Sequence, residues 1–445
     1  MTIVAAVVVL GVLIFVHELG HFLVAKWARV GVLKFSLGFG PKLVGVKRGE
    51  TEYLLSALPL GGYVKMIGED PADESPEAAD PERSFSKKRV GIRSLIILAG
   101  PAANLLLPVQ IFWGVFTFVG QPYFLPVMGS PEKNSPAEMA GLAAGDRIQA
   151  IDGKPIKQWD EIEAALQNSA GRTLRLSVLH QGRAEEISLT PRAQKTRDIF
   201  GQEIEAWDLG IHPLVSTRIG QVLPGQAAQQ AGIRGGDRVV AVNGAPVAEW
   251  EQLAKIIHAS AGKPLTLTVE RGGEQRSVEV TPRAGRQQTP TGEEEVGLIG
   301  IGPAPESHYQ RLNPVSAVVA GAGRTVDLSV LVVTGFVKLL EAKISPRTIG
   351  GPILIAQMAG EVAQRGLVDL LSFTALLSIN LAILNLLPIP ILDGGHLLFS
   401  LIEKLRGKPV SLRKREIAQQ VGMVLLVGLM VFAFYNDIFR WLGRP

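Results

Sequence analysis

Long apolar runs occupy the two ends of the chain, and a more polar stretch separates them. An α-helix needs roughly 20 apolar residues to cross the hydrocarbon core of a bilayer, and four runs approach that length. A cleaved signal peptide would need a basic start and a small-residue cleavage site, and the first run has neither. We therefore predict a polytopic α-helical membrane protein with about four transmembrane helices, near residues 2–24, 94–119, 370–390 and 418–435.

Basic residues flank these runs unevenly. They gather between the first and second runs and between the third and fourth, and none precedes the first run. Because short loops rich in Lys and Arg stay in the cytoplasm, we expect both loops to be cytoplasmic. Both termini and the long middle region are then expected on the other side of the membrane.

Residues 314–343 are ambiguous, because Arg324, Asp327 and Lys338 interrupt their apolar stretches. We favour an amphipathic helix that lies on the membrane surface or on the protein. A fifth crossing is the alternative, and it would reverse the direction of every later helix.

The middle region contains an internal repeat. Ala140–Trp159 reads AGLAAGDRIQAIDGKPIKQW, and Ala231–Trp250, which lies 91 residues later, reads AGIRGGDRVVAVNGAPVAEW. Each copy predicts a Gly-Asp turn, an alternating strand, an Asp-Gly or Asn-Gly turn and a helix, followed by two more alternating strands. The constant offset indicates two copies of one α+β domain.

Both copies resemble bacterial PDZ domains. Such domains commonly capture an extended peptide by strand addition. Capture of peptide C-termini or outer-compartment proteins is therefore one possible role, and a rigid spacer or steric filter is the other. The residues that carry the resemblance are Gly145-Asp146, Asp152-Gly153 and Trp159, with Gly236-Asp237, Asn243-Gly244 and Trp250 in the second copy.

His17, Glu18 and His21 form an HExxH motif inside the first predicted transmembrane helix. Residues four apart lie on one helix face, so both imidazoles can bind one zinc ion, and Glu18 is placed to take a proton from the attacking water. The motif alone is common, and a packed polar helix face is its structural explanation. Ionisable residues are costly inside a bilayer, however, so this cluster indicates a functional site.

A catalytic zinc site usually has three protein ligands. The chain contains no cysteine, so the third ligand must be His, Asp or Glu. His308 and His396, which is close to Asp393, are both acceptable on chemistry alone. His17 lies roughly 20 Å into a core about 30 Å thick, which places the site in the cytoplasmic half. The third predicted helix runs in the same direction and carries Asp393 toward that side.

Composition narrows the remaining possibilities. Apolar residues make up 47% of the chain, which excludes a wholly disordered or fibrous chain, and charged residues make up 19%, against about 25% in soluble domains. The length of 445 residues predicts two to four domains rather than one compact soluble domain. The net charge of +4 results from 45 basic and 41 acidic residues and does not indicate nucleic-acid binding. The absence of cysteine excludes disulfides, thiolate metal sites and cysteine nucleophiles.

The HELGH motif, the later sequence NLLPIPILDG at residues 385–394 and the paired repeats closely resemble the site-2 protease family of intramembrane zinc metalloproteases, over essentially the whole chain. The resemblance implies that His17, His21 and Asp393 bind Zn²⁺ and that Glu18 is the general base. It also implies that Asn385 holds the substrate or stabilises the oxyanion. His396 is then expected beside the ligands rather than among them.

Two further stretches, GFGP at residues 38–41 and LPLGGYVKM at residues 58–66, resemble the membrane-dipping β-hairpin of that family. We expect Gly61, Gly62 and Tyr63 to bind an unwound substrate along an edge strand, and a purely structural sheet is the alternative. The sequence AGPAAN at residues 99–104 also resembles a family motif, and its Asn104 is either structural or lines the site.

The resemblance implies a zinc-dependent intramembrane endopeptidase of the bacterial inner membrane, with both termini and the repeats in the periplasm. Its substrates would be single-span membrane proteins already trimmed outside the membrane, of the anti-sigma factor type, and also remnant signal peptides. A non-enzymatic membrane PDZ scaffold that recruits periplasmic partners is the alternative. A protease that cuts at the membrane surface is a third possibility.

The predicted boundaries follow from these patterns. They are residues 1–28 (first transmembrane helix), 29–93 (cytoplasmic loop with β-hairpin), 94–119 (second transmembrane helix), 120–195 and 212–284 (PDZ domains), 285–369 (outer segment with amphipathic helix), 370–396 (third transmembrane helix with the Asn and Asp-Gly motif), 397–416 (cytoplasmic loop) and 417–437 (fourth transmembrane helix).

Overall fold

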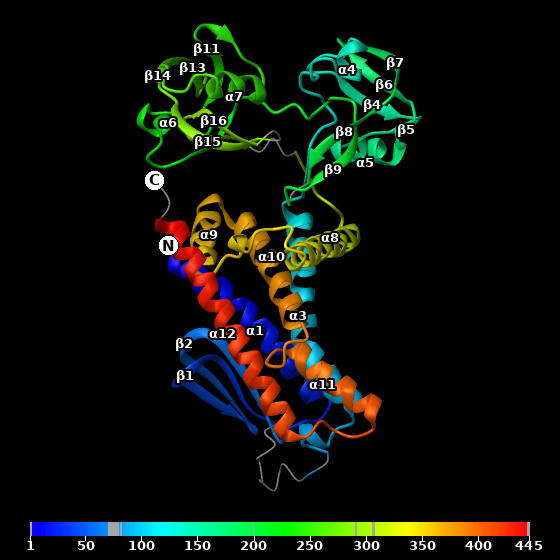
Figure 1. The fold of residues 1–445 in the computed structure, drawn as a ribbon, viewed down its shortest axis with the longest axis vertical. Helices are drawn as coiled ribbons and strands as arrows, with labels where there is room; N and C mark the ends of the chain where they lie inside the picture. Colours follow the sequence, from blue (N-terminus) through cyan, green and yellow to red (C-terminus); the bar gives the residue numbers. More distant parts are fainter. Residues whose placement is uncertain are drawn as a thin grey trace. The chain divides into compact units, whose positions relative to one another are not determined.

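A computed structural model describes residues 2–69, 80, 82–198, 200–289, 292–304 and 308–442. The chain separates into two compact units (Figure 1). The helical unit comprises Met1–Gly120 and Arg311–Pro445, and the repeat unit comprises Gln121–Gln310.

The helical unit is built from long apolar helices. Their large apolar side chains are widely exposed, as at Val4, Leu106 and Val424, which suits contact with lipid. The protein is thus a multi-pass membrane protein. Among the described residues its elements are α1 (Thr2–Trp27), β1 (Val32–Arg48), β2 (Thr51–Met66), α3 (Val90–Phe118), α8 (Pro314–Leu340), α9 (Pro352–Arg365), α10 (Leu367–Asn385), α11 (Asp393–Arg406) and α12 (Leu412–Leu442), with 3₁₀ turns at Phe85–Lys87 and Pro346–Thr348.

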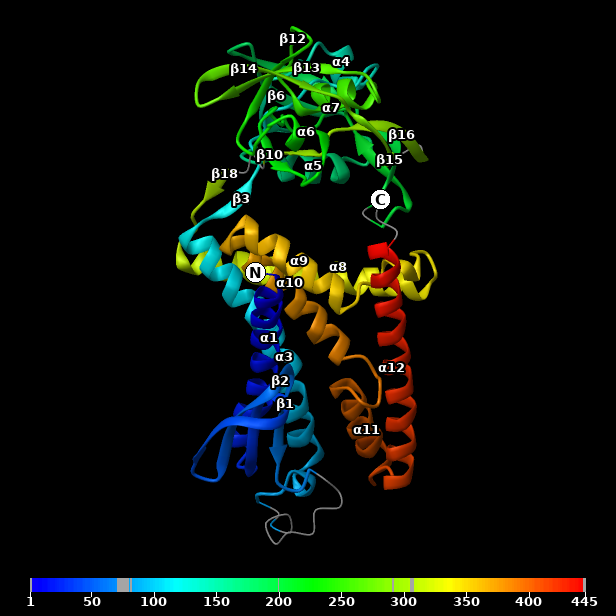
Figure 2. The same ribbon diagram turned by 90° about the vertical axis from the view of Figure 1, so that its left-hand side faces the viewer.

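Five described helices are long and apolar enough to cross a membrane, namely α1, α3, α8, α10 and α12. Helix α8 differs from α1, α3 and α12 in direction, because it runs across them (Figure 2). It packs on α3 through Ala317 and Gly321, which are buried, while Val319 and Val326 on its other faces are exposed. Helix α8 therefore matches the other four helices in length and apolarity but differs from α1, α3 and α12 in direction.

The expected third transmembrane helix, residues 370–396, is two helices in the structure. Helix α10 ends at Asn385, and α11 begins at Asp393. Proline lacks a backbone N–H and disfavours helical geometry in the preceding residue, so Pro388 and Pro390 prevent the helix from continuing. The loop predicted at residues 397–416 is shorter in the structure, because α11 continues to Arg406 and α12 begins at Leu412.

Strands β1 and β2 are long, and each is bent so that it contributes two segments to a single sheet. Residues 32–37 of β1 pair on one side with residues 52–55 and on the other with residues 62–66. Gly38 and Gly40 have positive φ angles of 94° and 87°, which glycine tolerates best, and they allow the bend. Residues 62–66 of β2 consequently form an edge with an unpaired side.

The two copies of the internal repeat have the same sheet order. The first sheet is β5-β4-β6-β7 and the second is β12-β11-β13-β14, and each repeat adds a two-stranded hairpin, β8-β9 or β15-β16. Leu209 is buried in the first core and Ile299 in the second, so each repeat extends beyond its predicted end at residue 195 or 284.

The elements of the repeat unit, among the described residues, are the following. They are β3 (Gln121–Tyr123), α4 (Pro136–Met139), β4 (Arg147–Ile151), β5 (Lys154–Pro155), α5 (Trp159–Ser169), β6 (Leu174–His180), β7 (Arg183–Leu189), β8 (Arg192–Arg197), β9 (Glu203–Asp208), β10 (Ile219–Val222), α6 (Ala227–Gln230), β11 (Arg238–Val242), β12 (Ala245–Pro246), α7 (Trp250–His258), β13 (Leu265–Arg271), β14 (Glu274–Val280), β15 (Arg283–Thr289), β16 (Gly292–Leu298), β17 (Ile301–Pro303) and β18 (His308–Gln310).

One ion pair differs between the repeats. In the first, His180 Nδ1 lies 2.8 Å from the buried carboxylate of Asp146. At the corresponding positions of the second repeat, Arg271 Nε donates to Asp237 Oδ1 over 2.6 Å. The hydrogen bond to Asp146 raises the pKa of His180, whereas arginine stays protonated. The first repeat thus contains a pair that titrates and the second a pair that does not.

This difference predicts a pH-dependent stability of the first repeat. Because the folded-state pKa of His180 is raised, its stabilising contribution is complete below the unfolded value of about 6.5 and is lost as the pH rises through the folded value. In the intact protein, hydrogen exchange corrected for its intrinsic pH dependence should show β4 and β6 losing protection at rising pH relative to β11 and β13. The substitution His180→Arg should remove this difference, and an unchanged pH response in that variant would contradict the interpretation.

Candidate metal centre

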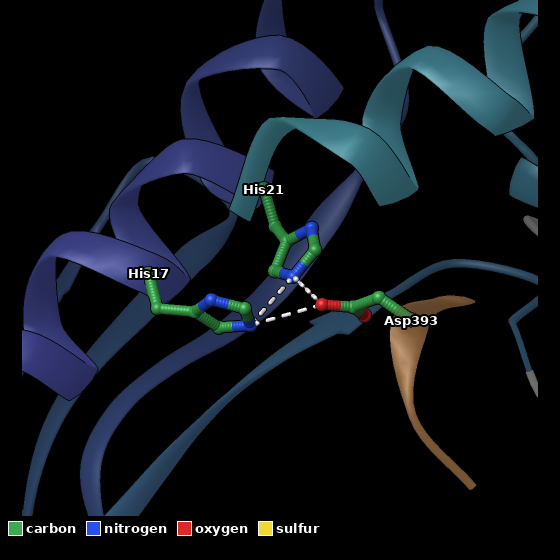
Figure 3. Close-up of side chains that lie close together, drawn as sticks. All are labelled: His17, His21 and Asp393. Carbon is green, nitrogen blue, oxygen red and sulfur yellow. Dashed lines mark hydrogen bonds and ion pairs between the residues drawn. The ribbon is translucent and has the colours of Figure 1, made fainter. Parts of the chain in front are cut away.

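His17 and His21 lie one turn apart on α1 and direct their imidazoles to the same point (Figure 3). Their Nε2 atoms are 3.2 Å apart, and His17 is buried, with 9% of its surface exposed. The predicted four-residue spacing therefore brings two ring nitrogens together on one helix face.

Asp393 provides a third atom at this point from the first residue of α11 (Figure 3). Its Oδ2 lies 3.1 Å from His17 Nε2 and 3.6 Å from His21 Nε2. Among the described residues, these three side chains are the group of His, Asp or Glu whose ligand atoms converge. Within the helical unit, the structure thus brings Asp393, and not His396, together with the two histidines.

The donor set fits a zinc ion. Asp393 Oδ2 is buried and has no hydrogen-bond partner, so three electron-pair donors face one another. Tetrahedral zinc with bonds of about 2.0–2.1 Å separates neighbouring ligand atoms by roughly 3.4 Å, which agrees with the observed spacings. Two histidines and one carboxylate also leave the fourth position that a catalytic site needs.

Backbone and amide groups orient the two imidazoles. His21 Nδ1 donates to the carbonyl oxygen of Ile96 on α3 over 2.8 Å, which leaves the electron pair of Nε2 for a metal. The amides of Asn104 and Asn385 lie 3.4 and 3.5 Å from His17 Nδ1. Asn104 Oδ1 is buried without a partner, and a half-turn of this amide would let it accept a hydrogen bond from Nδ1.

Helices α1 and α3 approach very closely at the centre. A side chain at Gly20 would clash with the Ala99 carbonyl oxygen, and one at Gly100 would clash with the rings of His21 and His17. The motif around Gly100 was noted in the sequence, but its contact with both histidines requires the folded structure. The role of the Ile96 carbonyl oxygen cannot be predicted from the sequence, because every residue has the same backbone acceptor.

The three converging side chains line a cavity with a volume of about 270 Å³, and Glu18 lines this cavity as well. Its carboxylate accepts a hydrogen bond from the backbone N–H of Val64 on β2. Gly62 and Tyr63 line this cavity as well. A side chain at the neighbouring Gly61 would clash with the Phe39 ring, so that glycine is required for packing. The general-base candidate and an edge strand therefore meet beside the candidate metal ligands.

His396 lines the cavity three residues after Asp393, with its ring centroid 6.4 Å from that of Phe399. His308 lies in the repeat unit on β18, beside Tyr123. The other candidates of the sequence analysis, Asn104 and Asn385, contact His17 as described above.

A family model described as peptidase family M50 matches residues 5–429. The chain belongs to this family. The resemblance to site-2 proteases that the sequence indicated is thereby confirmed, and the chain is a zinc-dependent metalloprotease. For this M50 peptidase, the converging histidines and aspartate are the natural candidates for the metal ligands.

Relatives of this M50 peptidase match over nearly its full length. The regulator of sigma-E protease RseP of Salmonella typhimurium is 38% identical over 453 residues, covering 98% of this chain and 98% of that protein. RseP of Escherichia coli is 37% identical over 450 residues, covering 98% and 97%. A protein of Neisseria meningitidis that carries the name of a zinc metalloprotease is 36% identical over 456 residues, covering 99% and 100%.

Smaller solved structures match part of the M50 peptidase. The PDZ domain of an SdrC-like protein from Listeria monocytogenes is 24% identical and covers 21% of this chain and 87% of that chain, with a TM-score of 0.16. The assignment of two PDZ domains stays a prediction.

The close contact at Gly100 predicts that even one added methyl group would disturb the metal centre. Gly100→Ala should displace both imidazoles and weaken zinc binding by at least about tenfold, as does loss of an orienting partner. Gly114→Ala is the matched control, because it lies on the same helix and its added Cβ meets nothing within 4 Å. Zinc affinity is measured by competition with a chelating dye in detergent. Equal affinities of the two variants would contradict the geometry described here.

Proposed function

We propose that this peptidase hydrolyses a peptide bond within the transmembrane segment of a single-span protein, using His17, His21 and Asp393 as zinc ligands and Glu18 as general base. The observation that carries the proposal is the convergence of these four side chains on one cavity within the apolar helical unit. An ionisable cluster at such a place is costly and needs a functional reason.

Zinc bound at this centre would activate a water molecule and polarise the scissile carbonyl group. Glu18 would accept the proton of the attacking water and later pass it to the leaving amine nitrogen. The Val64 N–H holds the Glu18 carboxylate toward the cavity. Asn385 lies close enough to the ligands for a role at the substrate carbonyl, and Asn104 lies where it can hold His17.

The edge segment 62–66 of β2 offers a surface for the substrate backbone. Its paired side faces residues 32–37 of β1, and the Val64 N–H points away from that neighbour toward Glu18. Backbone groups alternate in direction along a strand, so the N–H and C=O of Gly62 point the same way. An unwound substrate segment could pair there by strand addition, and Gly61, Gly62 and Tyr63 would contact it.

The proposed membrane arrangement has four crossings, with α8 lying on the surface. Its support is the distribution of basic loops, the direction of α8 across its neighbours and the interrupted crossing formed by α10 and α11 (Figure 2). Both termini and the repeats would lie in the periplasm, and the metal centre would lie toward the cytoplasmic side of the inner membrane. The repeats would act as PDZ domains that capture peptide ends or exclude substrates with bulky outer domains.

The names of the RseP relatives indicate the regulatory setting. Substrates of the anti-sigma factor type, first trimmed by another protease, are consistent with those names, and remnant signal peptides offer the same chemistry. A transmembrane helix hides its peptide bonds, so any such substrate must unwind before the centre can act on it. Mapping the products by mass distinguishes this function from the alternatives, because a surface protease would cut outside the apolar segment and a scaffold would not cut.

Glu18→Gln should abolish cleavage without abolishing zinc binding. The variant keeps the size of the side chain but removes the proton acceptor, which typically costs about 10²- to 10⁴-fold in rate. Cleavage of a trimmed model substrate is measured beside zinc stoichiometry, with His21→Ala as the control that should lose the metal. Retained cleavage in Glu18→Gln would show that another group is the base.

Helix-breaking residues in the substrate should accelerate cleavage. Each leucine-to-glycine change in a transmembrane helix lowers helix propensity by roughly 1 kcal/mol, so a pair near the scissile bond should raise kcat/KM about 10-fold or more. A glycine pair placed at the far end of the same segment is the control. Equal rates for the two substrates would mean that local unwinding does not limit the reaction.

A further inference from the structure

The three metal ligands come from two parts of the helical unit. His17 and His21 lie on α1, which α3 holds through the close approach at Gly20 and the hydrogen bond from His21 to Ile96. Asp393 arrives on α11, after the irregular segment 386–392. The position of α11 relative to α3 therefore determines whether the third ligand reaches the first two.

One ion pair joins these parts away from the ligands. Arg93 Nη2 on the first turn of α3 donates to Glu403 Oε1 on α11 over 2.5 Å. The side chains are 13% and 19% exposed, and both line the cavity of the metal centre. Among the described residues, the other ion pairs of α11 with α1 or α3 are those of Asp393 with the two histidines.

The location of this pair suits a mechanical role. Glu403 follows Asp393 by ten residues on one helix, which corresponds to about 15 Å. Arg93 precedes Ile96, the acceptor of the His21 hydrogen bond, by three residues on α3. A rigid helix held at Glu403 cannot tilt freely, and a ligand displaced by about 1 Å no longer fits a metal centre. The first two turns of α3 thus contact both His21 and the helix that carries Asp393.

We propose that Arg93 and Glu403 are positioning residues, whose ion pair holds α11 against α3 so that Asp393 completes the zinc site. The inference rests on the proposed ligand set. Neither residue is expected to touch the substrate carbonyl or the attacking water. Arg93 Nε is buried without a partner, and no second carboxylate among the described residues lies within ion-pair distance of Arg93. Loss of Glu403 would therefore leave a largely buried charge uncompensated.

The test compares zinc affinity in the full-length protein, purified in detergent, by competition with a chelating dye. Glu403→Gln and Arg93→Gln should each weaken zinc binding about tenfold or more. The reversed pair Arg93→Glu with Glu403→Arg should recover most of the affinity. The control is Lys343→Gln, which breaks an exposed 2.7 Å pair with Glu341 and should bind zinc like the wild type.

A second double variant keeps the test decisive if single changes impair folding. Arg93→Met with Glu403→Met leaves no unpaired charge, so it should fold, because apolar replacements of buried pairs are often neutral for stability. It lacks the directional contact, so its zinc affinity should stay below that of the wild type. Kinetic measurements on this variant should show a lowered kcat with an unchanged KM, because the proposed substrate-binding surface is the edge of β2 and not the ion pair.

The outcomes separate this proposal from the ligand assignment. If the wild-type protein binds one zinc ion and His21→Ala does not, the ligand assignment is supported. The zinc affinities of the Arg93 and Glu403 variants then decide the role of the ion pair. Wild-type affinity in folded Glu403→Gln or in the double methionine variant would overturn the proposal. Failure of a folded reversed pair to recover affinity would overturn it too.

Discussion

The convergence of three potential ligand atoms on one point is the constraint on which the helical unit depends. The spacings of 3.1–3.6 Å among His17 Nε2, His21 Nε2 and Asp393 Oδ2 are those expected of three ligand atoms around one zinc ion. The surrounding structure maintains them. Glycines allow two helices to touch, a backbone carbonyl selects the tautomer of His21, and an interrupted helix delivers the carboxylate.

The interruption between α10 and α11 follows from the same constraint. A continuous helix would satisfy its own backbone groups but would present Asp393 at a position dictated by its rise and rotation from Asn385. Ending α10 at Asn385 lets the chain turn through segment 386–392 and place Asp393 at the start of a new helix. Irregular backbone is tolerated at membrane depth where it is packed against protein or a cavity, and Ile391 and Asp393 line such a cavity.

Sequence predicted the elements whose information is local. Apolar runs indicate helices, and four-residue spacing puts His17 and His21 on one face. The duplicated pattern with its turn residues predicted two similar α+β folds. The break at Asn385 was missed because the apolar composition continues beyond it, although Pro388 and Pro390 signalled it. The contact of Gly100 with both histidines, the Ile96 acceptor and the pair of Arg93 with Glu403, 310 residues apart, depend on how helices meet.

The edge of β2 brings the proposed substrate surface beside the proposed base, an arrangement that neither motif indicates by itself. Glu18 and Gly62 both line the cavity of the metal centre, and the edge segment 62–66 leaves one side of its backbone unpaired there. A side chain at Gly62 would press on the Ser36 carbonyl oxygen and on Glu18 at 2.9 and 3.0 Å, which explains glycine at this position. Strand pairing at Gly62 would therefore bring a substrate peptide bond beside Glu18, which the same strand already holds toward the metal ligands.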